Sequence, residues 1–550
     1  MKRIITFLLV CLMVAGLFAG CTNNETPSTA PSSAPSASPS EAPETTDPEE
    51  DEPVGGLPIT AEKTTLTNWK TIQTLSTVFT DWNECAGYQE IEKRTNIHID
   101  FTIAPNGNES ETFNLLMASQ QYPDIIEFFS SYYTRGVDDA IDQEIIIRLN
   151  DVIDEYMPNY KALISNPERA LKTKADTGNI GLLYCIYNQP QFPWAGLSVR
   201  QDWIDDLGLE TPRTYGELHD VLTAFKEQKG AIAPLLLGPN GDTALGNCWS
   251  GGFQAINGMM QIDGTVYYGP LLDGYREYLE TFANWYSEGL IDRDFTTSPG
   301  FLSDTSRVYR NEAGVWFGFG AGDYEALHGQ PEDLDFLGYP IQNPVKNRGE
   351  TSHFKVMSDD VGIGSAISAD CDKVEIAARW LDYCYSEEGS LYLNFGIEGE
   401  TFIFDENNEP MMNAEGIAAK YGMPFSSLQQ STGPIEAPYL RHMYRNTPIR
   451  KSTVPLSEYS AYLPGEIWGQ DGQDWIIPTN ISPTADEGNE YTRIFADINT
   501  LVTETTVRII IGADPISAYD EMVAKVRTMG IDTAIALRQA AVTRYFNRGK

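Results

Sequence analysis

Short strand-like runs alternate with helix-like runs along this chain, and this order constrains the fold more than any single motif. Residues 97–103 alternate apolar and polar side chains as a half-buried strand does, and residues 86–94 before them have helical periodicity. A strand-like run at residues 64–67 precedes this helix, and Pro123 ends the next helix just before a buried strand. The order predicts an α/β fold with a largely parallel sheet, whose ligand site lies at the carboxyl ends of the strands.

The amino terminus has the pattern of an export signal. Lys2 and Arg3 supply positive charge, the 16 residues of Ile4–Ala19 are almost wholly apolar, and Cys21 follows two small residues. A membrane span is the alternative, but 16 helical residues cover only about 24 Å of a hydrocarbon core about 30 Å thick. We therefore predict a signal peptide at residues 1–20. The residues before Cys21 resemble a bacterial lipobox with phenylalanine in place of the usual leucine, which implies that Cys21 is diacylated and anchors the chain in the membrane.

Residues 21–58 are rich in Ser, Thr, Pro and Glu and almost lack bulky apolar side chains. Such a segment cannot bury enough apolar surface to offset its ordering entropy, so we predict a flexible, lipid-anchored linker. The remaining chain of about 490 residues is longer than one hydrophobic core usually accommodates, so we predict two lobes.

The net charge of −40 comes from 78 acidic and 38 basic residues. This balance argues against nucleic acid and against adhesion to anionic lipid. It also disfavours a strongly anionic ligand, although a local cluster of Arg or Lys can override a screened long-range field.

Of the seven cysteines, Cys11 would be removed with the signal peptide and Cys21 would be lipidated, which leaves five. An odd number of cysteines does not indicate a framework of paired disulfides. A helix over residues 372–385 would hold Cys371 and Cys384 about 20 Å apart, beyond the reach of a disulfide. We expect five structural thiols. No C-x-x-C pair exists and the five histidines are scattered, so the sequence predicts neither a metal site nor a cofactor.

The most informative stretch is residues 196–218, where a strand should end at Arg200 and a short helix should run from 202 to 207 and end at Gly208. Thr214 should cap the next helix, with Glu217 completing a capping box. Together with seven further blocks in the same order, which include Asp263–Gly264, residues 285–292 and residues 377–389, this stretch resembles the extracellular solute-binding proteins of family 1, the lipoprotein group that serves sugar importers.

The resemblance implies a type 2 periplasmic-binding-protein fold with two α/β lobes and a ligand between them. We expect lobe 1 to comprise residues 59–187 with 358–415, and lobe 2 to comprise residues 188–357 with 416–550. Hinge candidates are residues 187–191 and 357–361. The implied function is that of a monomeric, membrane-anchored extracellular lipoprotein, which captures an oligosaccharide and delivers it to the transmembrane permease of an ABC importer.

Aromatic side chains after strands or in glycine-rich loops are the candidate ligand contacts, because sugar rings lie flat on such faces. Trp203, Trp285 and Trp380 have helical spacing and are assigned to packing instead. The polar candidates are Asp124 and Arg200, for which an ion pair within one lobe is an equal alternative. The aromatic candidates are Trp69, Trp82, Tyr132, Trp194, Trp249, Phe317 and Phe319.

Two other functional classes stay open. A lipoprotein of the same fold can act as a sensor or a surface adhesin. A secreted glycosidase needs only two carboxylates about 5–10 Å apart, which no acidic sequence can exclude. The absence of a G-x-S-x-G elbow, a Walker loop and an H-E-x-x-H motif nevertheless favours a binding protein over an enzyme.

Overall fold

The structure is a computed structural model of the chain. The chain forms two compact units, Met1–Glu52 and Pro53–Lys550. The structure describes residues 56–71, 79–188, 193, 195–242, 248–298, 306–318, 338–353, 360–406, 408–422, 434, 437–441, 467–472 and 474–548. All of these belong to the second unit. Within these ranges no helix is both long and apolar enough to cross a membrane.

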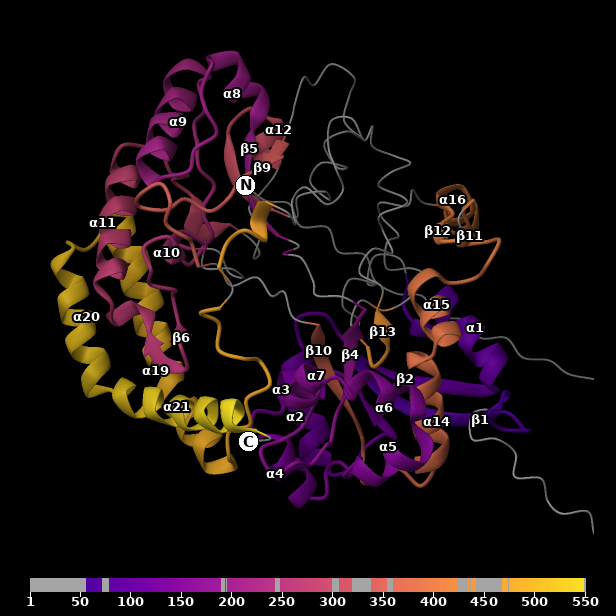
Figure 1. The fold of residues 1–550 in the computed structure, drawn as a ribbon. Helices are drawn as coiled ribbons and strands as arrows, with labels where there is room; N and C mark the ends of the chain where they lie inside the picture. Colours follow the sequence, from indigo (N-terminus) through magenta and orange to yellow (C-terminus); the bar gives the residue numbers. More distant parts are fainter. Residues whose placement is uncertain are drawn as a thin grey trace, which may run out of the picture. The chain divides into compact units, whose positions relative to one another are not determined.

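The larger sheet has six strands in the order β13-β4-β10-β3-β1-β2. Its indigo and purple strands come from the amino-terminal part of the chain and its orange strands from much later residues (Figure 1). The strands are β1 (Thr64–Thr71), β2 (Ile97–Ala104), β3 (Ile125–Ile126), β4 (Leu183–Tyr187), β10 (Val361–Ile367) and β13 (Leu440–Arg441).

The expectation of a largely parallel sheet holds for only part of the structure. In the larger sheet β1 pairs in parallel with β2 and β3, and β4 pairs in parallel with β13, whereas β10 is antiparallel to both of its neighbours. The physical reason is the route of the chain. β10 starts at Val361, which pairs with Ile186 at the carboxyl end of β4, so a strand that enters at this edge must run the opposite way.

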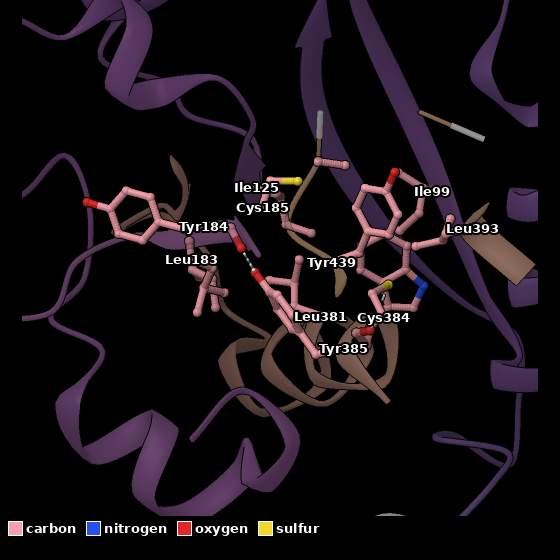
Figure 2. Packing of buried hydrophobic residues seen from close by; sticks show 14 of the residues in the cluster. Ile99, Ile125, Leu183, Tyr184, Cys185, Leu381, Cys384, Tyr385, Leu393 and Tyr439 are labelled. Atoms are coloured by element: carbon pink, nitrogen blue, oxygen red, sulfur yellow. Dashed lines mark hydrogen bonds between the residues drawn. The ribbon is translucent and has the colours of Figure 1, made fainter. Parts of the chain in front are cut away.

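Helices cover this sheet, and their apolar residues form one core with it. Its buried residues run from Ile59 to Tyr187 and from Val361 to Tyr439. Figure 2 shows part of this core, in which the hydroxyl of Tyr385 donates to the carbonyl oxygen of Tyr184 at 2.7 Å. The elements beside the sheet are η2 (Trp82–Glu84), α1 (Ala86–Thr95), α2 (Glu109–Ser119), α3 (Phe129–Tyr132), α4 (Val137–Asp142), α5 (Asn150–Tyr156), α6 (Pro158–Ile164), α7 (Pro167–Thr173), α14 (Val374–Tyr385), α15 (Glu387–Phe395), α16 (Ala414–Tyr421) and the hairpin β11 (Phe402–Phe404) with β12 (Pro410–Met412).

A second core lies around a three-stranded sheet in the order β8-β5-β9, in which both pairings are antiparallel. This sheet corrects the parallel expectation for the second half of the chain. The strands are β5 (Gly196–Arg200), β8 (Val315–Gly318) and β9 (Gly338–Pro340), with the hairpin β6 (Met259–Ile262) and β7 (Thr265–Tyr268). The helices are α8 (Gln201–Leu207), α9 (Tyr215–Gln228), α10 (Cys248–Gly251), η3 (Gly269–Leu271), α11 (Asp273–Ser287), η4 (Phe295–Thr297), α12 (Ser306–Tyr309), α19 (Ala485–Ile510), α20 (Ser517–Thr528) and α21 (Ile531–Asn547).

Several local predictions are confirmed. β5 ends at Arg200, α8 ends at Gly208 with φ +63°, and Thr214 and Glu217 form the capping box of α9. The β6–β7 turn has positive φ at Asp263 and at the glycine after it, 49° and 81°, as a type I′ turn requires.

The first core reaches further along the chain than the predicted boundary of lobe 1 at residue 415. β13 pairs with β4, and the side chain of Asn394 donates to the carbonyl oxygen of Leu440 at 2.9 Å. Tyr439 beside β13 is buried in the first core. The last strand of the larger sheet therefore comes from a part of the chain that was assigned to lobe 2.

The five cysteines of the described ranges are all buried thiols: Cys85, Cys185, Cys248, Cys371 and Cys384. Burial raises the pKa of Cys371 to about 12 and raises the pKa of Cys384 further. Both groups are therefore protonated and poorly nucleophilic at neutral pH, as structural thiols are.

Candidate functional site

The carboxyl end of β1 holds two of the predicted aromatic contacts, and both are packed against other side chains. Trp69 is 1% exposed and meets Tyr132 edge to face, with ring centroids 6.0 Å apart. Trp82 is also 1% exposed, and its Nε1–H donates to the carbonyl oxygen of Thr71 at 3.1 Å. Tyr132 is half-buried and is the more accessible partner of Trp69.

A buried ion pair lies beside these rings. Lys70 of β1 donates to the carboxylate of Glu127, which follows β3, and both side chains have at most 1% of their surface exposed. Asn68 donates to the other oxygen of Glu127 at 2.7 Å, and the Lys70 ammonium lies 4.8 Å from the centre of the Trp82 ring. A buried charge needs such partners, so this network fixes the ends of β1 and β3 against each other.

The two polar candidates are engaged inside their own halves of the fold. Asp124 accepts from the backbone N–H and the hydroxyl of Thr67, at 2.7 and 2.8 Å. Arg200 donates to both carboxylate oxygens of Asp202, at 2.8 and 2.5 Å, and to Asn311 at 2.6 Å. For Arg200 the structure shows the ion pair within one half that the sequence left open.

The remaining aromatic candidates belong to the second core or lie outside the described residues. Trp249 and Phe317 are 0% and 2% exposed and pack within the second core. Among the described candidates, Trp69 and Tyr132 are in direct ring contact. Trp194, Phe319 and the predicted lipidation site Cys21 lie outside the described residues. The packing assignments of Trp203, Trp285 and Trp380 are confirmed by their burial.

Three chain segments leave the larger sheet at one edge, after β4, before β10 and after β13. Their ends are tied together, since the backbone N–H of Tyr187 donates to the carbonyl oxygen of Asp360 at 2.9 Å, and Asn188 bonds likewise to Arg441 at 3.0 Å. Arg169 and Lys172 donate to the Asp360 carboxylate at 2.7 and 2.8 Å. Burial works against ionisation, but the two cations hold the pKa of Asp360 below its usual value. The hinge candidates begin and end at this edge, and their residues 189–191 and 357–359 lie outside the described part.

A pocket lies where α3 and β4 of the first half meet the segment before α19 and the helix α21 of the second half. Its volume is about 190 Å³. Tyr184 contributes one wall, and its ring points away from the core residues labelled in Figure 2. We call this site the junction pocket. Its lining residues are Phe129, Ser130, Tyr133, Thr134, Gly136, Val137, Lys174, Ala175, Leu182, Tyr184, Thr479, Asn480, Ile481, Ser482, Pro483 and Arg538.

The junction pocket combines flat aromatic faces with hydrogen-bonding groups. Asn480 has a buried Nδ2 group with no hydrogen-bond partner in the described structure, although a buried donor normally finds one. The Tyr133 hydroxyl donates to Asp139, and burial, the largest cause, acts with this bond to raise the pKa of Tyr133. Burial also raises the pKa of Tyr184, to about 12, so both phenols stay neutral at physiological pH.

Ion pairs beside the pocket tie the two halves together. Asp176, which follows α7, accepts from Arg544 and Arg548 of the carboxy-terminal segment, both at 2.7 Å. Arg544 also contacts both oxygens of Glu487, the capping residue of α19. The walls of the junction pocket are thus held by contacts from both halves of the fold.

Across the described ranges, no cluster of three or more His, Cys, Asp or Glu side chains is arranged to hold an ion. The junction pocket offers aromatic, hydroxyl, amide and cationic groups, which suit binding of a polar organic molecule.

Sequence reasoning missed the residues of the second half that line this pocket. The segment 479–483 has no aromatic residue and directly precedes the capping box formed by Thr484 and Glu487, so it resembles an ordinary helix entry. Arg538 lies within a long helix, where an arginine normally faces solvent. The available sequence signal for this wall of the pocket was the group of polar residues in segment 479–483, just before the capping box.

Comparison with known proteins shows the family to which this chain belongs. Residues 76–390 match the family described as "Bacterial extracellular solute-binding protein". The fructooligosaccharide ABC transporter substrate-binding protein FusA of Streptococcus pneumoniae serotype 4 (strain TIGR4) is 23% identical over 517 residues, which cover 84% of this chain and 88% of FusA. The lipoprotein LipO of Bacillus subtilis (strain 168) is 25% identical over 372 residues, which cover 60% of this chain and 68% of LipO.

The solved structure of S. pneumoniae FusA in complex with kestose has the same fold. It superposes with a TM-score of 0.68 at 21% sequence identity, and the match covers 88% of this chain and 99% of FusA. The predicted two-lobed α/β class and the predicted family are therefore confirmed.

Proposed function

The chain belongs to the bacterial extracellular solute-binding protein family, and from this premise we propose that it captures an oligosaccharide outside the cell for an ABC importer. Its similarity to FusA, whose name specifies a fructooligosaccharide, supports a saccharide ligand. The observation that carries the proposal is the junction pocket, which Tyr133 and Tyr184 line and in which Asn480 offers an unpartnered donor for a sugar oxygen.

We propose the junction pocket as part of the ligand site, together with Tyr132, Trp194 and Phe319 from the sequence prediction. The buried Trp69, Trp82, Trp249 and Phe317 would then support neighbouring loops through packing. A ligand that touches both halves binds the closed form better and shifts the population toward it by no more than its differential affinity. On this proposal the protein releases its solute unaltered to a permease.

The anchor is the second part of the proposal. Lipidation of Cys21 would hold the protein at the extracellular face of the cell membrane, and the similarity to the lipoprotein LipO supports this. Replacing Cys21 with serine should leave the secreted chain in the medium instead of the membrane fraction. Retention of the Cys21→Ser chain in the membrane would contradict the anchor and leave the saccharide proposal intact.

The saccharide proposal is tested by a thermal-shift screen of the purified protein against neutral and acidic oligosaccharides and against peptides. A ligand at 100 times its dissociation constant stabilises the folded state by about 2.7 kcal/mol, which is readily measured. At least one oligosaccharide should raise the melting temperature, and its chain length should be unchanged after incubation. A shift with peptides alone, or cleavage of the saccharide, would contradict the proposal.

A matched pair of variants ties binding to the junction pocket. Asn480→Ala removes the unpartnered donor and should weaken binding by up to about tenfold, the value of one neutral hydrogen bond. Asn284→Ala changes an exposed residue of α11 and should bind like the original protein. Equal affinities in both variants would place the ligand elsewhere.

A further inference from the structure

The charge of the junction pocket is opposite to the charge of the chain. Although the sequence has 78 acidic residues, no Asp or Glu is among the described residues that line this pocket. Its two charged residues are both cations, Lys174 after α7 in the first half and Arg538 of α21 in the second half. A pocket of this composition is unexpected in a chain with a net charge of −40 and calls for a physical reason.

Neither cation has a carboxylate partner among the described residues. No carboxylate oxygen there lies within the 4.0 Å of an ion pair from Lys174 or Arg538, although most other described Lys and Arg side chains have such a partner. The guanidinium of Arg538 instead lies 3.8 Å from the centre of the Tyr491 ring, which orients its planar group. One exposed lysine would be unremarkable, but two unpaired cations from opposite sides of one pocket are a specific arrangement.

Three carboxylates close in sequence to residues of the pocket or of the adjoining pocket already have other partners. Asp139 accepts from Tyr133 and Arg135, and Asp176 accepts from two arginines of the carboxy-terminal segment. Glu487 lines an adjoining pocket of about 230 Å³ that shares Arg538, but it pairs with Arg544 and caps α19. Lys174 and Arg538 therefore remain available to a ligand.

Three polar groups of the pocket are N–H donors without a carboxylate partner among the described residues. The Lys174 ammonium, the Arg538 guanidinium and the buried Nδ2 of Asn480 all present N–H groups and need acceptor oxygens. A carboxylate accepts several such bonds, and bonds between charged groups are about twice as strong as neutral ones. A neutral sugar would leave both cations without a counter-charge.

From these observations we infer that the junction pocket recognises a carboxylate-bearing sugar, so that the solute is an oligosaccharide containing uronic acid. This inference rests on the proposed function and specifies the class of its ligand. Lys174 and Arg538 would hold the carboxylate from the two halves, in a pocket that Tyr133 and Tyr184 also line. Because the two cations come from opposite halves, an anionic group between them also favours the conformation in which both reach it.

The experiment compares tri-galacturonate with its fully methyl-esterified form, which keeps the shape and removes the charge. Isothermal titration of the purified protein should give at least tenfold tighter binding of the acid, as expected for charge-assisted hydrogen bonds. The double variant K174Q/R538Q should lose this preference while its affinity for the ester stays within about twofold. The matched control is K525Q, because Lys525 of α20 lies outside the junction pocket and has no acidic partner among the described residues; it should keep the preference.

The outcomes separate this inference from the proposed function. If neutral oligosaccharides bind and uronates do not, the uronate assignment is wrong and the saccharide receptor stands. If the acid is preferred but K174Q/R538Q keeps the preference, the assignment to this pocket is wrong. If no saccharide of either charge binds, both the inference and the proposed function are wrong.

Discussion

Two regions of this acidic protein contain cations, and the partners of those cations differ between the two regions. In the first core, Lys70 has its carboxylate in Glu127, a supporting bond from Asn68 to that carboxylate, and the Trp82 ring beside it. In the junction pocket, Lys174 and Arg538 have no carboxylate within the described structure. The Lys70 network pairs its cation with a carboxylate and stabilises the fold. The cations of the junction pocket can still donate hydrogen bonds to a ligand. The comparison teaches that charge alone does not mark a binding site, but an unmet charge in a pocket does.

Breaking the buried pair should produce the largest effect. Lys70→Met leaves the Glu127 carboxylate buried without its cation and should lower the free energy of unfolding by about 3–5 kcal/mol in urea titrations. The double variant K70M/E127Q removes both charges and should recover much of that loss. Losses below about 1 kcal/mol in K70M would show that the pair contributes little to the fold.

A buried acid without an ion-pair contact among the described residues extends the comparison to a carboxylate. Asp471 is 5% exposed, and burial raises its pKa to about 7, opposed by hydrogen bonds from Asn343 and by the charge of Arg213. The folded state therefore binds a proton more tightly than the unfolded state, so stability falls as pH rises from about 4 to 7 and is constant above. The fall should be on the order of 2–4 kcal/mol.

Denaturant titrations at pH 5, 6, 7 and 8 check this direction. The difference in unfolding free energy between the original protein and Asp471→Asn isolates the titration of this one group. As pH rises through this range, the unfolding free energy of the original protein should fall relative to that of the Asn variant. A difference that is independent of pH would mean that Asp471 has an ordinary pKa.

The helix cap beside the junction pocket should have a smaller effect. The Thr484 hydroxyl accepts from the backbone N–H of Glu487, and Glu487 bonds back to Thr484. Thr484→Ala should cost about 1 kcal/mol of stability, as loss of an N-cap usually does. Thr214→Ala removes the equivalent cap of α9, far along the chain, and serves as the control. Saccharide affinity should fall only in the first variant, because only Thr484 adjoins the pocket segment 479–483.

The smallest expected effect concerns the pocket cations themselves. Since neither has an ion pair to lose, K174Q/R538Q should change the free energy of unfolding by less than about 0.5 kcal/mol, apart from the Arg538–Tyr491 contact. Urea titration without ligand measures this. A loss of several kcal/mol would show that these residues serve the fold, as Lys70 does.

Local sequence signals predicted much of the fold, because they act over a few residues. The capping box at Thr214, the helix end at Gly208 and the hairpin turn at Asp263 depend on side chains within one turn of the chain, and all three are present. The reversed direction of β10 was not predictable in this way. It depends on where the chain re-enters the sheet after a long excursion, which no local pattern records.

The candidate site was less predictable for the same reason. Trp249 lies in a glycine-rich stretch and was predicted to contact the ligand, but long-range packing in the second core covers it completely. Lys174 and Arg538 are more than 350 residues apart and carry no motif, so only the folded arrangement brings them to one pocket. Sequence identifies the family; the charge of the pocket comes from tertiary contacts.

Hydrogen–deuterium exchange with and without an oligosaccharide that shifts the melting temperature tests the central claim most directly. The account predicts protection on binding in peptides that cover residues 129–137, 174–184 and 479–483, the described walls of the junction pocket. Peptides of the buried Lys70 network should already be protected and change little. Protection that is absent from both walls of the pocket while the ligand is bound would contradict the account.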